Sequence, residues 1–137
     1  VYLLDLIEDH CRFFTETARI VRQTGCLVAV LNHPAYTAPG SAPLLDEHGE
    51  VLWRWGSYFE SGSSAEPAGH REIRFHHRSL GRLLTDAAAS GWILDAVIER
   101  GLSAETVGEI PGYVGQEHIP RLLGVRWNRD PARRALT

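Results

Sequence analysis

The sequence predicts one α/β domain built around a layered sheet, and two observations support this prediction. Apolar residues at helical spacing alternate along the chain with short apolar runs, in the order strand, helix, strand, long insert, helix, strand, strand. The chain has 137 residues, of which 44% are hydrophobic and 23% charged, as in ordinary globular domains. A disordered or fibrous protein is therefore excluded.

The first third of the chain predicts a strand–helix–strand unit. Residues 1–4 form a short apolar run that predicts a strand. Asp9 is a candidate helix N-cap, and apolar residues then recur at helical spacing, which predicts a helix over about 10–23 that ends before Gly25. Residues 26–31 are apolar at every position, which is typical of a central parallel strand covered on both faces.

The middle of the chain, residues 32–72, has no regular apolar spacing and is rich in Gly, Pro, Ser and Ala. Loops of this length are commonly lids or binding loops. Residues 60–70 combine small side chains with no periodicity, so we expect them to be the most mobile internal stretch. Five aromatic residues nevertheless indicate that part of the segment packs against the core: Tyr36, Trp53, Trp55, Tyr58 and Phe59.

The last third predicts a helix and two strands. Ser79 is the candidate N-cap of a helix over about 80–90, and strands follow over 93–99 and 121–127. The connection between these strands, residues 101–118, carries Gly and Pro and no helical pattern. The last strand is therefore expected to run antiparallel to a neighbour in the same mixed sheet.

Charge and composition argue against several classes of partner. The net charge is −3 and the isoelectric point is about 6.2, so a nucleic-acid partner is not expected. No apolar run reaches the length of a membrane span and no signal peptide is recognisable, so we expect no membrane association. Cys11 and Cys26 are expected to be reduced, buried thiols, which indicates a cytoplasmic protein.

Four short motifs occur in an order and spacing that match a known enzyme family. They are residues 17–30, with Arg19, Arg22 and Gly25 before an apolar strand, then Asn32-His33-Pro34, His77-Arg78-Ser79-Leu80 and Ala89-Ser90-Gly91-Trp92. In this combination the chain resembles the C-terminal half of class I S-adenosylmethionine-dependent methyltransferases, in their small-molecule branch. Gln23 and Thr24 depart from the family's usual Pro and Gly in the turn.

The resemblance implies a fold and an activity. The fold would be a Rossmann-like methyltransferase sheet, mixed parallel with an antiparallel last strand and helices on both faces. Residues 1–127 would form the C-terminal half of the domain, with a lid or substrate-binding insertion over 33–76 and a tail over 128–137. The activity would be methyl transfer from S-adenosylmethionine to a small molecule.

One feature of the family is missing from the sequence. The family binds its cofactor with a Gly-rich loop and an acidic residue, and no G-x-G motif occurs in this chain. The chain would then supply the substrate half of the enzyme. The alternative is a truncated or degenerate, non-catalytic α/β domain that serves as an oligomerisation or interaction module.

The candidate site residues lie where two predicted strands end, since open α/β sheets bind ligands there. The resemblance places Leu4 and Asp5 near the methionine part of the cofactor. Asn32, His33 and Pro34 are substrate-binding candidates, and His33 is a candidate general base because its ordinary pKa is near 6.5. The alternatives are a capping or turn role for Asp5 and a rigid turn at residues 32–34.

The insertion supplies further candidates. Trp53, Trp55 and Tyr58 are expected either to wall an apolar substrate pocket or to pack as a lid. Arg54 or Arg74 could hold an acidic substrate, although exposed arginines are the ordinary case. No metal is expected at His70, His76 and His77, because adjacent His76 and His77 on an extended segment point to opposite faces.

The edge of the predicted first strand, residues 1–4, has no predicted partner strand on one side. Strand edges left unpaired recruit other chains. We therefore expect a homodimer, or a partner that carries the N-terminal half of the fold.

Overall fold

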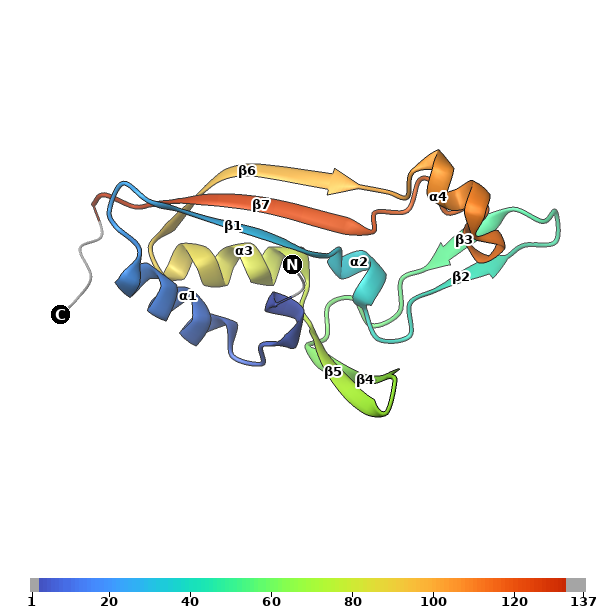
Figure 1. Cartoon of the computed structure of the whole chain (residues 1–137), viewed down its shortest axis with the longest axis horizontal. Coiled ribbons are helices and arrows are strands. Elements are labelled where there is room, and N and C mark those ends of the chain that lie inside the picture. Colours follow the sequence, from blue (N-terminus) through green and yellow to red (C-terminus); the bar gives the residue numbers. More distant parts are fainter. Residues whose placement is uncertain (1–2, 133–137) are drawn as a thin grey trace.

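The computed structural model describes residues 3–132, apart from the side chains of residues 66–68, and its centre is a three-stranded sheet (Figure 1). The strands are β1 (Cys26–Asn32), β6 (Trp92–Arg100) and β7 (Leu122–Arg129), in the order β1-β7-β6. β7 pairs antiparallel with both neighbours. Three of the four strands predicted for this sheet and the antiparallel last strand are confirmed, but no adjacent parallel pair occurs among the described residues.

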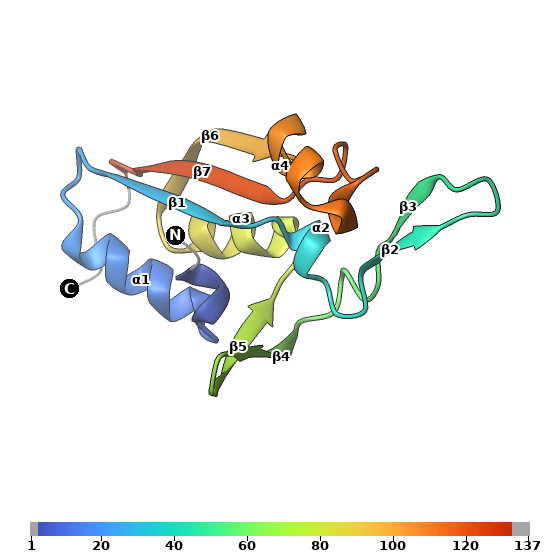
Figure 2. The ribbon, with the colours of Figure 1, turned by 45° about the vertical axis from the view of Figure 1, so that its right-hand side comes forward.

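Two helices cover one face of this sheet (Figure 2). They are α1 (His10–Ile20) and α3 (Leu80–Ala89), close to the predicted bounds. Each begins at the predicted N-cap: the Asp9 side chain accepts from the Arg12 amide, and the Ser79 side chain accepts from the Arg82 amide. The expected arrangement with helices on both faces is wrong for the part of the chain that the structure describes.

The core lies between these two helices and the sheet. Its fully buried side chains come from both helices and from every second residue of β7: Phe14, Leu83, Leu123, Val125 and Trp127. The Phe14 ring meets the Trp127 ring edge to face, with 5.4 Å between centroids, and the Trp92 Nε1–H donates to the Phe14 carbonyl at 3.0 Å. Ring packing and this hydrogen bond join α1 to the sheet.

The opposite face of the sheet exposes apolar side chains around the Arg126–Asp95 ion pair. Val28, Val30, Ile93 and Ile98 are 62%, 40%, 48% and 54% exposed. We expected β1 to be covered on both faces because all its residues up to Leu31 are apolar, and within residues 3–132 that expectation is wrong. Its apolar pattern is that of a two-faced strand, yet no described segment covers the second face.

The N-terminal apolar run does not form a strand in the described residues. Leu3 lies in a turn and Leu4–Leu6 form the 3-10 helix η1, in which the amides of Leu6 and Ile7 donate to the carbonyls of Leu3 and Leu4. The strand prediction is therefore wrong at Leu3 and Leu4, and residues 1–2 lie outside the described part. The backbone of this segment closes its hydrogen bonds locally, in the manner of a 3-10 turn.

The insertion is ordered into one short helix and two hairpins. These are α2 (Pro34–Thr37), the antiparallel pair β2 (Ala42–Leu45) and β3 (Val51–Arg54), and the antiparallel pair β4 (Gly62–Ala68) and β5 (Arg71–His77). The β2–β3 hairpin projects from the body of the molecule (Figure 1). Residues expected to lack regular structure thus form four strands, while the expected mobility of residues 60–70 stays a prediction.

The connection between β6 and β7 also differs from expectation. It contains α4 (Ala104–Glu109) and the 3-10 helix η2 (Pro111–Tyr113), where no helix was predicted. The Ser103 side chain caps α4 by accepting from the Thr106 amide at 3.1 Å. The apolar pattern of a six-residue helix is too short to stand out in the sequence.

Cys11 and Cys26 are free, as expected, but both are exposed, so their predicted burial is wrong. Cys11 lies on the solvent side of α1, and Cys26 begins β1. Within residues 3–132, no helix has the length and apolar character needed to cross a membrane.

Candidate functional site

The carboxyl end of β1 leads directly into α2 through His33. The His33 Nδ1 accepts from the Ala35 amide at 3.0 Å and so caps α2. The His33 amide in turn donates to the Arg121 carbonyl at 2.9 Å. Pro34 is buried at the first position of the helix, where its missing amide proton costs nothing.

The second ring nitrogen of His33 is also engaged. Nε2 lies 2.7 Å from Oε1 of Glu99 on β6. Because Nδ1 accepts a backbone proton, Nε2 carries the ring proton and donates it to the Glu99 carboxylate. In this arrangement neither nitrogen is available to take a proton from a substrate. The general-base role of His33 stays a prediction, and the geometry favours positioning of α2.

Asp5 joins η1 to the end of β1. Its Oδ2 accepts from both the Asn32 amide and the Asn32 side chain, each at 3.1 Å. The residue is only 6% exposed, and burial raises the pKa of Asp5, with the two Asn32 hydrogen bonds and the Arg78 charge acting in the opposite direction. These contacts hold Asn32 in place at the end of the strand.

A cleft of about 390 Å³ lies beside Asn32, between α2 and the two hairpins; we call it the aromatic cleft. The Tyr36 and Trp53 rings stack with 5.4 Å between centroids and 22° between planes. The Trp53 Nε1–H donates to the Ala35 carbonyl at 3.0 Å, which fixes the indole against α2. The remaining lining residues are Thr37–Pro43, Ser64 and Phe75.

The aromatic cleft has the character of a site for a small organic molecule. Such sites combine aromatic walls with a few polar groups that fix orientation. Here the walls are Tyr36, Trp53 and Phe75, and Asn32 and Ser64 supply polar groups. The guanidinium of Arg121, 3.5 Å from the Tyr36 ring centroid, stabilises that ring by a cation–π contact.

The structure brings only some of the predicted site residues together. Asn32 and Trp53 line the aromatic cleft. Leu4 and Asp5 are buried behind Asn32, and His33 and Pro34 are buried at the start of α2. This separates residues that form the cleft from residues that support it.

Trp55 and Tyr58 lie outside the aromatic cleft. The Tyr58 hydroxyl accepts from the Leu80 amide at 3.0 Å, and the Tyr58 carbonyl accepts from His77 Nε2 at 2.8 Å. Trp55 meets the Tyr58 ring edge to face and is 57% exposed. Both residues therefore belong to the contact between the insertion and the start of α3, and their proposed substrate role is untested.

Two aromatic residues of the cleft, Tyr36 and Phe75, were not among the predicted site residues. Tyr36 appeared in the sequence only as an aromatic residue of the insertion, although it closely follows Asn32-His33-Pro34. Phe75 lies on β5 between Arg74 and His76, and period-two alternation along residues 71–77 would have placed it on the opposite face from both.

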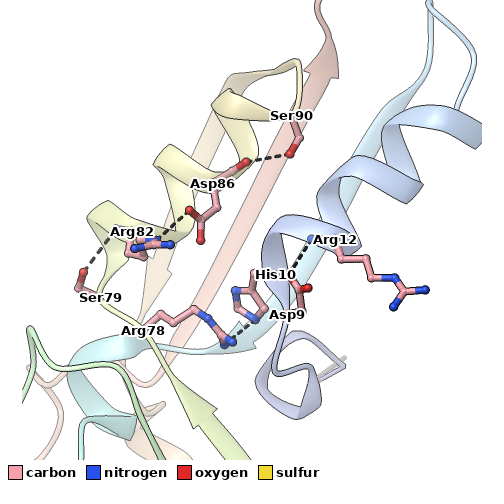
Figure 3. Close-up of polar contacts among 8 residues, drawn as sticks. All are labelled: Asp9, His10, Arg12, Arg78, Ser79, Arg82, Asp86 and Ser90. Atoms are coloured by element: carbon pink, nitrogen blue, oxygen red, sulfur yellow. Dashed lines mark hydrogen bonds and ion pairs between the residues drawn. The ribbon is translucent and has the colours of Figure 1, made fainter. Parts of the chain in front are cut away.

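A buried contact links α1 to the segment between β5 and α3 (Figure 3). His10 is 4% exposed, and its Nε2 lies 2.7 Å from the Leu4 carbonyl oxygen and 3.0 Å from Arg78 Nη1. Burial lowers the pKa of His10 to about 4, and the Arg78 charge acts in the same direction. His10 is therefore neutral at pH 7.

We expect the free energy of unfolding to fall as the pH drops from 6.5 towards 4. In this window the unfolded chain protonates His10 at its ordinary pKa of 6.5 and the folded chain does not, so acid favours unfolding by on the order of 2 kcal/mol. His77, whose pKa burial also lowers, acts in the same direction. Asp5, whose pKa is raised, acts oppositely at the acid end of the window.

Urea unfolding at pH 7 and pH 4.5 measures this effect, and the His10→Gln variant should lose much of the difference. His48→Gln, an exposed residue at the tip of the β2–β3 hairpin, is the matched control and should keep the full difference. An unchanged pH dependence in His10→Gln would contradict the assignment.

Comparison with known proteins shows the fold. No protein-family model matches the chain, and no curated protein is significantly similar to it in sequence. Two crystal structures are similar in fold: a "putative S-adenosylmethionine dependent methyltransferase" from Listeria monocytogenes, with a TM-score of 0.76 and 18% identity, and an S-adenosylmethionine dependent methyltransferase from Mesorhizobium loti, with a TM-score of 0.77 and 24% identity.

The coverage of these matches is unequal. Each match covers 93% of this chain but only 58% and 59% of the two neighbours, respectively. The chain thus has the fold of part of a methyltransferase, which confirms at the level of fold the resemblance found in the motifs. The match is consistent with the predicted C-terminal half.

Proposed function

We propose that this chain is the substrate-binding half of an enzyme that transfers a methyl group from S-adenosylmethionine to a small molecule. The observation that carries the proposal is the aromatic cleft at the carboxyl end of β1, in a chain with a methyltransferase fold. This end of a strand is where open α/β sheets bind their ligands. The neighbours' activity supports methyl transfer in general, and the small-molecule acceptor is our inference from the cleft.

The residues described here do not by themselves fit the cofactor. Leu4 and Asp5, which the resemblance places beside it, are 3% and 6% exposed, and one Asp5 oxygen is taken up by Asn32. No Gly-rich loop occurs in the chain to let a backbone approach the cofactor closely. We therefore propose that a segment beyond these 137 residues holds the cofactor.

The work left to this chain is to bind and orient the acceptor. Methyl transfer from a sulfonium depends strongly on in-line placement of the accepting atom, so positioning alone contributes much of the rate. The Tyr36–Trp53 stack offers a rigid wall, because Trp53 is tied to the Ala35 carbonyl and Tyr36 lies on α2. Asn32, held by Asp5, offers a fixed polar group beside this wall.

The test uses the chain extended upstream by its natural coding sequence, with radiolabelled S-adenosylmethionine and a panel of small aromatic and hydroxylated acceptors. Trp53→Ala should lower kcat/KM by about tenfold, mainly through a higher KM, because the wall binds the acceptor without reacting. Phe59→Ala, an aromatic residue that is 89% exposed, is the matched control and should change kcat/KM less than twofold.

The second candidate is a non-catalytic interaction module, which the bare apolar face of the sheet favours. Assays of the extended chain distinguish these two candidate functions. No transfer to any acceptor by a folded extended chain that binds S-adenosylmethionine would argue for the module. Transfer with equal losses in Trp53→Ala and Phe59→Ala would place the acceptor elsewhere.

A further inference from the structure

We propose that a second cleft, formed by the other face of the β4–β5 hairpin, binds the anionic oxygen group, carboxylate or phosphate, of the methyl acceptor; we call it the cationic cleft. It measures about 520 Å³, and its lining residues are Glu8, Ser61–Ser63, Arg74 and His76–Arg78. That the anion is part of the methyl acceptor rests on the proposed function. That the cleft binds an oxyanion is independent of the proposed function.

The hairpin register explains why the two clefts differ in character. Ser64 pairs with Phe75, and both line the aromatic cleft. Ser63 pairs with His76, and these two residues, with Arg74, line the cationic cleft. Since successive residues of a strand point to opposite faces, the hairpin is a shared wall with an aromatic side and a cationic side.

Arg78 is the half-buried cation of this cleft. Its Nη1 lies 3.0 Å from His10 Nε2, which donates to the Leu4 carbonyl and therefore cannot accept from the guanidinium. The ion pairs of the described residues do not include Arg78, and the nearest α3 carboxylate, Asp86, is paired with Arg82 at 2.8 Å (Figure 3). Burial lowers the pKa of Arg78, and the charges of Asp86 and Asp9 act in the opposite direction.

Other groups of the cleft complete an oxyanion site. Arg74 Nη1 donates to the Ser63 hydroxyl at 3.1 Å, which holds its guanidinium against the hairpin. Burial lowers the pKa of His77, so the ring is neutral at pH 7, although its Nε2–H hydrogen bond to the Tyr58 carbonyl acts in the opposite direction. Glu8 is the one carboxylate lining the cleft, and Arg74 also lies 3.9 Å from the exposed Glu72 carboxylate, so Arg78 is the guanidinium of the cleft without an ion pair among the described residues. Arginine donors of this kind bind carboxylate and phosphate groups well.

The two clefts adjoin at the end of the hairpin. Thr37 lines the aromatic cleft, His77 lines the cationic cleft, and their Oγ1 and Nδ1 atoms are 3.5 Å apart. An acceptor whose body lies against Trp53 can therefore direct an acidic group past Thr37 towards Arg78. This arrangement selects acidic over neutral acceptors of the same shape.

The binding test uses the 137-residue chain, amide and side-chain NMR, and two probes, inorganic phosphate and benzoate, titrated at pH 7 and constant ionic strength. Saturable shifts should centre on Ser63, Arg74 and His76, and Arg78→Gln should weaken binding about tenfold. Arg71→Gln, on the same strand but outside the cleft, is the matched control and should change it less than twofold.

Further outcomes decide the proposal. If Arg78→Gln does not fold, Arg74→Gln, whose side chain is 58% exposed, takes its place and should weaken binding about threefold. Shifts that spread over all arginines, or equal losses in the cleft variants and Arg71→Gln, would overturn it. Binding of phosphate but not benzoate would identify the anionic group as phosphate rather than carboxylate. Binding of neither probe would overturn the proposed oxyanion site.

A second readout separates this inference from the proposed function. In the extended chain, Arg78→Gln should lower kcat/KM for acidic acceptors about tenfold and leave neutral acceptors within twofold. Methyl transfer that is indifferent to Arg78 would refute the cationic cleft and leave the proposed function standing. Oxyanion binding without any methyl transfer would do the reverse.

Discussion

Replacing Phe14 by alanine should lower the free energy of unfolding by about 3–5 kcal/mol, the usual loss for a buried phenylalanine. Phe14 has no exposed surface, and its ring packs against Phe13 and Trp127 with centroid separations of 5.4 Å to each. Truncation would leave a cavity at the one point where α1 meets the centre of the sheet. Since the sheet has a single helical layer among the described residues, little else can close that cavity.

Denaturant unfolding followed by tryptophan fluorescence measures the Phe14→Ala effect, because Trp92 and Trp127 lie in the same core cluster. Ile20→Ala is the matched control: it lies on the same helix but is 68% exposed, and it should change the free energy by less than about 0.5 kcal/mol. A loss below about 1 kcal/mol in Phe14→Ala would mean that α1 is not docked as described.

The regular elements with one buried face could be read from the sequence. In α1 and α3, the N-caps Asp9 and Ser79 and the apolar spacing fixed the start of each helix, because capping and burial depend on residues close in the chain. β1, β6 and β7 were recognisable from their apolar runs. Their order was not, since the pairing of β7 with both neighbours depends on contacts between distant segments.

The strands of the insertion were not predicted because they are short, polar and interrupted by proline. Pro43 lies within β2 and pairs with Trp53, and β2 and β3 form a separate two-stranded sheet. Proline is tolerated at such edges, whereas it reads in the sequence as a break. The β4–β5 hairpin lines both clefts and the β2–β3 hairpin lines the aromatic cleft, so most of this region could not be predicted from periodicity. Of the candidate site residues, Asn32 and Trp53 line the aromatic cleft, and their role stays a prediction.

The exposed face of the sheet is the most informative disagreement between sequence and structure. A strand as apolar as β1 predicted cover on both sides, and the described residues provide cover on only one. The match covers only 58% and 59% of the two neighbours of known structure, so a large part of each neighbour lies outside it. We therefore propose that the missing cover is either a cofactor-binding segment of the fold or, in its absence, a second copy of this chain.

The chain extended upstream should bind S-adenosylmethionine with micromolar affinity and transfer methyl groups, whereas the 137-residue chain should do neither. Calorimetry and a radiolabel assay measure the two activities. Val28→Asp tests whether the upstream segment covers the exposed face of the sheet. The Val28 side chain is 62% exposed here, so the variant should fold normally as the 137-residue chain. In the extended chain the same carboxylate would be buried beside Arg126, which is already paired with Asp95, and should cost at least about 2 kcal/mol.

Val114→Asp is the control for this experiment, because Val114 is 59% exposed in the connection after η2, away from the sheet face, and should be neutral in both forms. Sedimentation of the 137-residue chain at high micromolar concentration separates the two proposed covers. A dimer that Val28→Asp dissociates would mean that a second copy occupies the face. If the 137-residue chain is a stable monomer, and Val28→Asp changes the free energy of unfolding of neither the short nor the extended chain, the sheet face is not an interface. Micromolar binding of S-adenosylmethionine by the 137-residue chain would show that residues around Asn32 suffice to bind the cofactor.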